Sequence, residues 1–346
     1  MKCSRGVPVV LAMAIAVVLG SAGWLIPRAH AQTVDRLRPE VTTAENLSND
    51  QRRQIDQYVS GWAEQLMDGD LRRVNEARRQ LLESLRAGTP SDAFVQYYSA
   101  QVAQRVPNAL EHEQSATRVN AMIVVARLRS DDAMPLVEQA MMDDNAAVRY
   151  WAVKAIQSIT FADDQKTQLI ERLVEHIDQE PVVAVVEQAM LALVGLDLSD
   201  ARMRGLSLLN QRLDEHLEEA GRSLQAEHSA MRSVYQHLAG TGSPNEQELR
   251  QLARTAVRYQ DLAAQRLRDG DVDNTVRDSY ERILQLCNAA LRFTADSLNA
   301  SGVPSSIDPL IGRGDWAGIQ RNADQWRSLL QNAPFNLSED DIALTS

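Results

Sequence analysis

The sequence predicts an all-α protein: an α-solenoid of paired antiparallel helices followed by a coiled-coil-like bundle of long helices. Glycine and proline are scarce, at 16 and 11 of 346 residues, whereas an all-β fold needs frequent turn residues. From about Leu47 onward, apolar residues recur at helical spacing and helix-capping residues occupy the breaks. In residues 111–198 the helices fall into pairs with a period in the thirties, which is typical of a solenoid.

The N-terminal residues 1–31 have the pattern of a secretory signal peptide. Two basic residues precede an uncharged stretch, residues 6–26, and the segment ends in Ala-His-Ala at residues 29–31. We therefore expect cleavage after Ala31 and export, either to a periplasm or out of the cell. The alternative is an uncleaved inner-membrane anchor, because the uncharged stretch is long enough to span a bilayer. Residues 32–46 lack a periodic pattern and predict a flexible leader.

The charge balance argues against general nucleic-acid binding. The chain has 36 basic and 47 acidic residues, and cleavage after Ala31 would leave 33 basic residues and a formal net charge of −14. Only three basic residues are lysines, and we attribute the excess of arginine to base composition rather than to function. Cys287 would be the single cysteine of the mature chain, which excludes an intramolecular disulfide there. Its place on an apolar helical stripe predicts a buried, inert thiol.

The predicted solenoid covers residues 47–198 and starts with three helices. The first begins after Ser48, which forms a capping box with Gln51, and stops at Gly69. The second covers residues 70–88, and the third residues 91–106. Short connections between helices of similar length predict antiparallel neighbours.

The most informative stretch is Asp-Asp-Asn-Ala-Ala-Val-Arg-Tyr-Trp-Ala-Val-Lys-Ala-Ile at residues 143–156. An acidic turn is followed by Val-Arg and then by small and aliphatic residues at helical spacing. A shorter match, Thr-Arg-Val-Asn-Ala at residues 117–121, lies 31 residues upstream. Residues 178–190 match residues 144–156 at an offset of 34, with a valine in place of the arginine. This pattern resembles the second helix of a HEAT repeat over about 85 residues.

The resemblance implies structural roles for five positions. Asp144 and Arg149 would hold neighbouring repeats in register, and Arg118 occupies the place of Arg149 in the upstream unit. Trp151 and Ala152 lie on one apolar face with the aliphatic residues at 148, 155, 156 and 159, and this face would be buried by stacking. Related solenoids serve as scaffolds, transport receptors and, occasionally, enzymes, so the resemblance indicates the fold more than the function.

Residues 199–300 predict a bundle of three long helices. Apolar residues at 206–238 follow steps of three and four with one gap at Glu227, which predicts a single long helix that Gly221 can kink. A capping box at residues 243–246 starts the second helix, and the third follows a short acidic turn.

The tail, residues 301–346, is broken by glycine and proline. It predicts one short helix bearing Trp316 and Trp326, and its acidic end at residues 338–341 is expected to be solvated.

No motif predicts catalysis, a cofactor or a metal. Asp269, Asp271 and Asp273 have the spacing of a calcium loop, but Asn274 and Tyr280 occupy the positions that need glycine and a bidentate acid. A turn between helices is therefore favoured. No histidine follows a glutamate at the three- or four-residue spacing of helical metal sites, and neither a nucleophile motif nor a phosphate loop is present.

The leading functional hypothesis is an exported, non-catalytic adaptor or scaffold that binds an unidentified protein partner. One alternative is a self-assembling structural or envelope-associated protein, forming a homo-oligomer through the helices of residues 199–300. Another is an enzyme or metal-binding protein without a recognisable motif. Nucleic acid is not expected as a partner, and membrane contact is expected only if the N-terminal segment is uncleaved.

Overall fold

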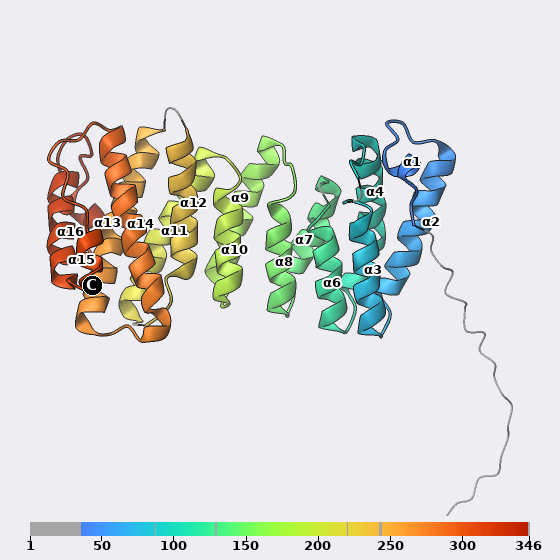
Figure 1. Ribbon diagram of the computed structural model, residues 1–346, viewed down its shortest axis with the longest axis horizontal. Coiled ribbons are helices and arrows are strands. Elements are labelled where there is room, and N and C mark those ends of the chain that lie inside the picture. Colours follow the sequence, from blue (N-terminus) through green and yellow to red (C-terminus); the bar gives the residue numbers. More distant parts are fainter. Residues whose placement is uncertain (1–35, 87, 129, 220, 242–243, 345–346) are drawn as a thin grey trace, which may run out of the picture. The chain divides into compact units, whose positions relative to one another are not determined.

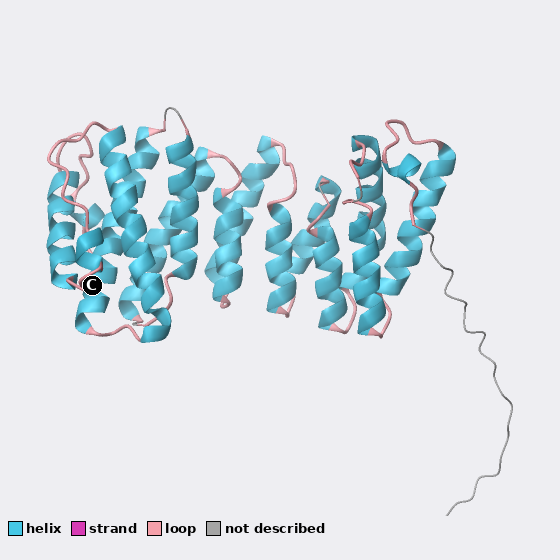
Figure 2. Cartoon of the chain, viewed as in Figure 1, coloured by secondary structure: helices cyan, strands magenta, loops and turns pink. Residues whose placement is uncertain are grey.

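Helical spacing of apolar residues produces helices throughout the described part of the chain. The computed structural model describes residues 36–86, 88–128, 130–219, 221–241 and 244–344, and no strand occurs among them (Figure 2). The first half contains α1 Pro39–Thr42, α2 Asn49–Leu66, α3 Leu71–Glu83, α4 Asp92–Arg105, α5 Pro107–Leu110, α6 Ser115–Val125, the 3₁₀ helix η1 Asp131–Ala133, α7 Met134–Met141 and α8 Ala146–Ile156. The second half contains α9 Asp163–Gln179, α10 Val183–Val194, α11 Ser199–Glu218, α12 Gln225–Gly240, α13 Glu246–Asp269, α14 Asn274–Ser297, α15 Asp308–Ile311, α16 Trp316–Leu330 and α17 Glu339–Ile342.

Side-chain caps set many of the helix starts. The predicted capping box at α2 is present: the Ser48 hydroxyl accepts a hydrogen bond from the Gln51 amide, and the Gln51 side chain accepts one from the Ser48 amide. Asn145 caps α8 and Asn245 caps α13 in the same way, by accepting from an amide in the first turn. These caps satisfy amide groups that a helix start leaves without a partner.

The helices form two layers that follow the chain (Figure 1). In one layer α3, α6, α8, α10, α12 and α14 pack each against the next. In the other, α2, α4, α5 and α7 are in contact in turn, as are α9, α11, α13 and α16. The all-α solenoid predicted from the periodicity is thus confirmed, and we call the first set the α3–α14 layer.

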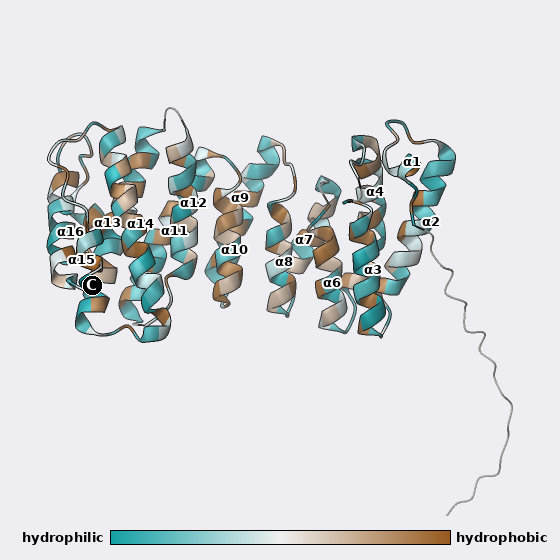
Figure 3. Ribbon diagram, viewed as in Figure 1, coloured by the Kyte–Doolittle hydropathy of each residue, from teal (hydrophilic) through white to brown (hydrophobic). Residues whose placement is uncertain are grey.

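The apolar core lies between and within these layers. In Figure 3, α10 is largely hydrophobic, and it packs against α8, α9, α11 and α12. The heptad residues of 199–300 are buried inside the chain as well, for example Leu213, Val234, Leu252 and Ile283. Because these side chains are already covered, they are not available to pair with a second copy of the chain.

The helix predicted across residues 206–238 is wrong, because this segment forms two helices. α11 ends at Glu218 and α12 begins at Gln225, and Gly221 lies in the connection with φ +84°, a conformation that favours glycine. Residues 199–300 therefore contain four helices among the described residues instead of three. α12 packs on α10 and α11 on α9, so helices on both sides of residue 198 are in contact. The division of the chain at that residue stays a prediction.

The predicted flexible leader is wrong for residues 36–46. This segment contains α1, and Val41 is buried against the body of the protein. The Thr42 carbonyl accepts from the Ser91 amide (2.9 Å), the Ala44 carbonyl from the Ser91 hydroxyl (2.6 Å), and the Glu40 carbonyl from the Gln51 side chain (2.9 Å). Contacts far apart in the sequence therefore fix this segment.

The tail forms the predicted tryptophan-bearing helix as α16, and Trp326 is fully buried. α16 and α17 both pack against α13. Glu339 and Asp340 are exposed as expected, but Asp341 forms an ion pair with Arg254 of α13 (3.1 Å).

The predicted signal peptide, residues 1–31, lies outside the described residues. None of the described helices is both long enough and apolar enough to cross a bilayer.

Candidate functional site

Two arginines in the α3–α14 layer, Arg118 of α6 and Arg149 of α8, bind their surroundings in the same way. Arg118 donates from Nε and Nη2 to the two carboxylate oxygens of Asp143 (2.8 and 3.0 Å), in the turn before the next helix of the layer. Its Nη1 donates to the carbonyls of His112 and Glu113 (2.9 and 3.2 Å), in the turn before its own helix. The side chain thus joins two successive turns.

Arg149 repeats this arrangement one unit later. Its Nε and Nη2 donate to Glu180 (2.7 and 2.8 Å), and its Nη1 donates to the carbonyls of Asp143 and Asp144 (2.8 and 3.2 Å). The Glu180 side chain is 1% exposed and also accepts from the Val182 amide at the start of α10 (2.9 Å). A bidentate arginine–carboxylate pair of this kind fixes both distance and orientation.

The carboxylate partners are ionised. Burial acts to raise the pKa of Asp143 and that of Glu180, but the hydrogen bonds from the arginines and from backbone amides, together with the arginine charges, outweigh it, and both pKa values lie below the ordinary range. Burial also lowers the pKa of His176, whose Nε2 lies 3.6 Å from Glu180, so this histidine is neutral at pH 7.

The other predicted repeat positions lie in different environments. The Asp144 side chain is 87% exposed and receives one hydrogen bond from Arg118, so Asp143 is the main acceptor at this turn. Ala152 is fully buried, as expected for the apolar face. Trp151 was expected on that face but is only partly buried, and it lines a surface hollow. The role of Asp144 and Arg149 in holding the repeat register stays a prediction.

That hollow opens on the α3–α14 layer and has a volume of about 700 Å³. Five arginines from α3, the turn after it, and the turn after α6 line it, and Ile123 and Trp151 supply apolar surface. We call this set the arginine hollow: Arg72, Arg78, Arg79, Arg86, Arg127, Ile123 and Trp151.

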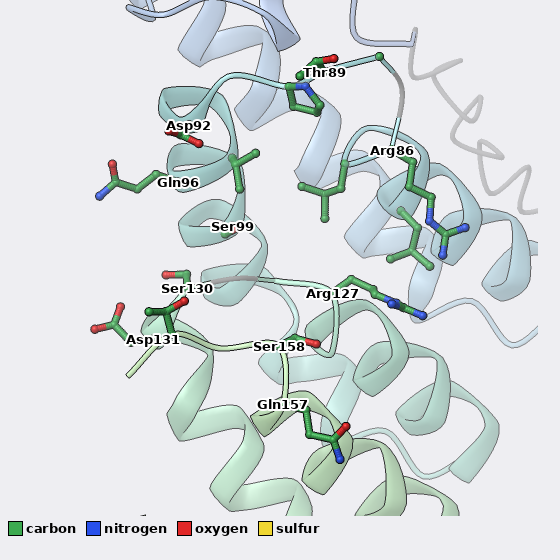
Figure 4. Close-up of a pocket in the computed structure, with 16 residues that line it drawn as sticks. Arg86, Thr89, Asp92, Gln96, Ser99, Arg127, Ser130, Asp131, Gln157 and Ser158 are labelled. Atoms are coloured by element: carbon green, nitrogen blue, oxygen red, sulfur yellow. The ribbon is translucent and has the colours of Figure 1, made fainter. Parts of the chain in front are cut away.

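A second hollow of about 920 Å³ adjoins the first (Figure 4). It lies among α4 and the loops that follow α3, α6 and α8, and we call it the loop hollow. Arg86 and Arg127 line both hollows, and Figure 4 shows their guanidinium groups on the same side. The remaining lining is mainly hydroxyl, amide and carboxylate groups, including Ser99, whose buried hydroxyl has no partner among the described residues.

Most of the hollow's arginines are free of ion pairs. Arg79 is paired with Glu76 (2.7 Å), but Arg72, Arg78, Arg86 and Arg127 form no ion pair among the described residues. These four side chains therefore keep their donors for water or for a bound group, and the hollow is suited to binding anions.

The carboxylates and the thiol considered for metal binding or nucleophilic chemistry have structural roles among the described residues. No cluster of three or more His, Cys, Asp or Glu that could hold a metal occurs among the described residues. At the acidic turn before α14, Asp269 pairs with Arg268, Asp271 pairs with Arg266 and Asp273 caps the helix. Cys287 is fully buried, and burial raises the pKa of its thiol far above the ordinary range.

Sequence reasoning missed the arginine hollow because it assigned the arginines to base composition. A signal was present: Arg72, Arg79 and Arg86 are spaced by seven residues, which places them on one side of a helix. The partners Asp143 and Glu180 were missed as well. Each of them lies in the turn before the helix that follows the arginine's own helix in the α3–α14 layer.

Comparison with known proteins supports the repeat assignment. Residues 103–194 match a family model described as HEAT repeats. This range contains Arg118, Arg149 and both of their carboxylate partners. The resemblance read from residues 117–190 is confirmed, and the matched segment is HEAT-repeat-like. A search of curated proteins found no match.

Proposed function

We propose that this HEAT-repeat-like chain is an exported, non-catalytic scaffold that binds a partner protein on the α3–α14 layer, over the arginine hollow. The observation that carries the proposal is this hollow, to which three successive helices of the layer contribute. Stacked repeats present a continuous surface, and such surfaces suit an extended partner. HEAT-like solenoids typically act in protein interactions, which agrees with this use.

Two features favour a protein partner over a small substrate. The hollows are wide and adjoin one another, whereas a small-molecule pocket encloses most of its ligand and is mainly apolar. The lining also combines charged groups with a partly exposed tryptophan, and arginine and tryptophan are enriched at the centres of protein interfaces. Self-assembly through residues 199–300 is disfavoured, because the heptad residues are buried within the chain.

Site-specific crosslinking in the cells that make the protein tests this proposal. A photo-crosslinking amino acid is placed at Arg78, in the hollow, and as a matched control at Glu171, an exposed position of α9 in the other layer. We expect one protein to be crosslinked stoichiometrically from position 78 and not from position 171. Equal crosslinking from both positions, or none from position 78, would refute the proposed binding face.

Export is tested separately by fractionation and by sequencing the N-terminus of the native protein. We expect a chain that starts at Gln32 and is released with the periplasmic or external fraction. A chain that keeps residues 1–31 in the membrane fraction would favour the anchored form. A cytoplasmic chain with an intact N-terminus would contradict export.

A further inference from the structure

We infer that the arginine hollow binds an acidic segment of the partner protein, one in which carboxylates flank an apolar side chain. This inference rests on the proposed function and specifies the chemistry of the partner at the same face. Three observations carry it: the local excess of arginine, the apolar floor, and the sign of the charge on the rest of the chain.

The hollow is basic within an acidic protein. Five arginines line it against two acids, Glu76 and Glu83, while the chain as a whole carries a formal net charge of −11. Four of these arginines have no ion-pair partner among the described residues, as noted above. An acidic segment is attracted to this place and is repelled by the net negative charge of the rest of the chain, so charge both steers the segment and selects its position.

The floor of the hollow fits an apolar side chain. Ile123 of α6 and Trp151 of α8 are both partly exposed there. The Lys154 ammonium lies over the Trp151 ring, 4.8 Å from its centre, and this cation–π contact helps to hold the ring in place. An aliphatic residue seated on Ile123 and Trp151 brings carboxylates on either side of it within reach of the arginines.

A nucleic acid fits less well. In the adjoining loop hollow Asp92 and Asp131 lie on the side opposite Arg86 and Arg127 (Figure 4), so a phosphate backbone leaving the arginine hollow in this direction meets carboxylates. Nucleic-acid binding requires a continuous basic track. A peptide needs only a few carboxylates in the right place, and its own amide groups can pair with the polar lining of the loop hollow.

Peptide binding to the purified mature protein tests the inference. The probe is a fluorescein-labelled peptide with three copies of Glu-Leu-Glu-Asp, and its neutral counterpart has three copies of Gln-Leu-Gln-Asn. The variant Arg86→Glu/Arg127→Glu reverses two free arginines of the hollow. Its matched control, Arg313→Glu/Arg321→Glu, makes the same charge change at exposed positions near and on α16.

We expect the acidic peptide to bind at least tenfold more tightly than the neutral one. The hollow variant should raise its Kd at least tenfold, and the control variant less than twofold. Binding should weaken between 50 and 300 mM salt, because exposed charge pairs are screened. Substitution of Trp151 by alanine should also weaken binding, which a purely electrostatic attraction does not predict.

The possible results separate this inference from the proposed function. Crosslinking of a protein at position 78, together with equal loss of peptide binding in both charge variants, would overturn the acidic-segment inference and leave the scaffold function standing. Tighter binding of a twelve-residue oligo-dT, or of vesicles containing anionic lipid, with the same loss in the hollow variant would also overturn it. Loss of peptide binding confined to the hollow variant would support it, provided that circular dichroism shows both variants folded.

Discussion

Replacing Arg149 by alanine should destabilise the protein by about 3 kcal/mol, because it breaks a buried ion pair. The substitution removes two hydrogen bonds to Glu180 and two to backbone carbonyls. The Glu180 carboxylate is 1% exposed and would be left buried without a cationic partner. Removing one member of a buried pair costs 3–5 kcal/mol. Arg149 is 14% exposed, so some water reaches the site, and we take the lower end of this range.

Three further variants, Glu180→Gln, Arg149→Ala/Glu180→Gln and Arg172→Ala, separate the ion pair from the loss of side-chain volume. In Arg149→Ala/Glu180→Gln the carboxylate charge is also removed, so the double variant should be more stable than the sum of the single effects predicts, by about 2 kcal/mol. Arg172→Ala breaks an exposed ion pair between α9 and Glu138 of α7, and it should cost less than about 0.5 kcal/mol.

Urea denaturation followed by circular dichroism measures these differences, and hydrogen exchange locates them. The exchange of α8 and α10 amides should accelerate in Arg149→Ala, because the pair joins α8 to the start of α10. A free energy of unfolding for Arg149→Ala within 1 kcal/mol of that for Arg172→Ala would show that the buried pair contributes no more than an exposed one. Additive effects of the Arg149 and Glu180 substitutions would likewise contradict a direct interaction between the two side chains.

Two other predictions follow from single sites. Gly205→Ala in α11 should destabilise the protein by about 1–3 kcal/mol, because the new Cβ would lie 2.7 Å from Val194 Cγ1 of α10. This loss should outweigh the better helix propensity of alanine. The control is Gly240→Ala, which has no atom within 4 Å of its Cβ and should be neutral or stabilising in the same urea assay. Burial lowers the pKa of His176 and that of His228, so below pH 6.5 the unfolded chain binds protons that the folded chain does not. The contribution of the two neutral histidines to stability is therefore complete above pH 6.5 and is lost as the pH falls below it. The variant His176→Gln/His228→Gln should therefore lose less stability than the wild type between pH 7.5 and 5.5, and an equal loss in both would contradict this reasoning.

The sequence predicted the helices well where local chemistry alone defines them. The capping box at Ser48 lies where the residue types indicated. The capping box predicted at residues 243–246 is displaced, because α13 begins at Glu246 and Asn245 is its cap. A cap depends on residues within one helical turn, so it can be recognised from a short stretch of sequence. The same is true of the repeat period, which the chain displays several times.

The predictions failed where a distant contact determines the structure. Glu227 was treated as one gap in an apolar stripe, but its side chain is fully buried. Its carboxylate accepts a hydrogen bond from Arg212 Nε (2.8 Å) and lies 3.1 Å from His216 Nε2. These contacts hold α12 against α11, and they require a turn between the two helices. A buried charge with partners on another helix looks like an interruption of the stripe, so periodicity alone cannot reveal the hairpin. The ordered segment before α2 was missed for the same reason, since Ser91, which holds it, is 47 residues from Ala44.

The candidate site could not be predicted from the sequence, because a high arginine content does not distinguish arginines that pair within the chain from arginines that remain exposed and unpaired. Arg118 and Arg149 bind carboxylates and carbonyls within the chain, whereas Arg86 and Arg127 are exposed and unpaired among the described residues. Only burial separates these uses, and burial depends on the packing of helices that are remote in sequence. Net charge is an equally coarse guide, because the acidic residues that make the chain anionic are spread over its surface and its turns. A local excess of arginine can therefore attract an anionic partner although the whole chain is acidic, and the search for a partner should begin with acidic proteins of the same compartment.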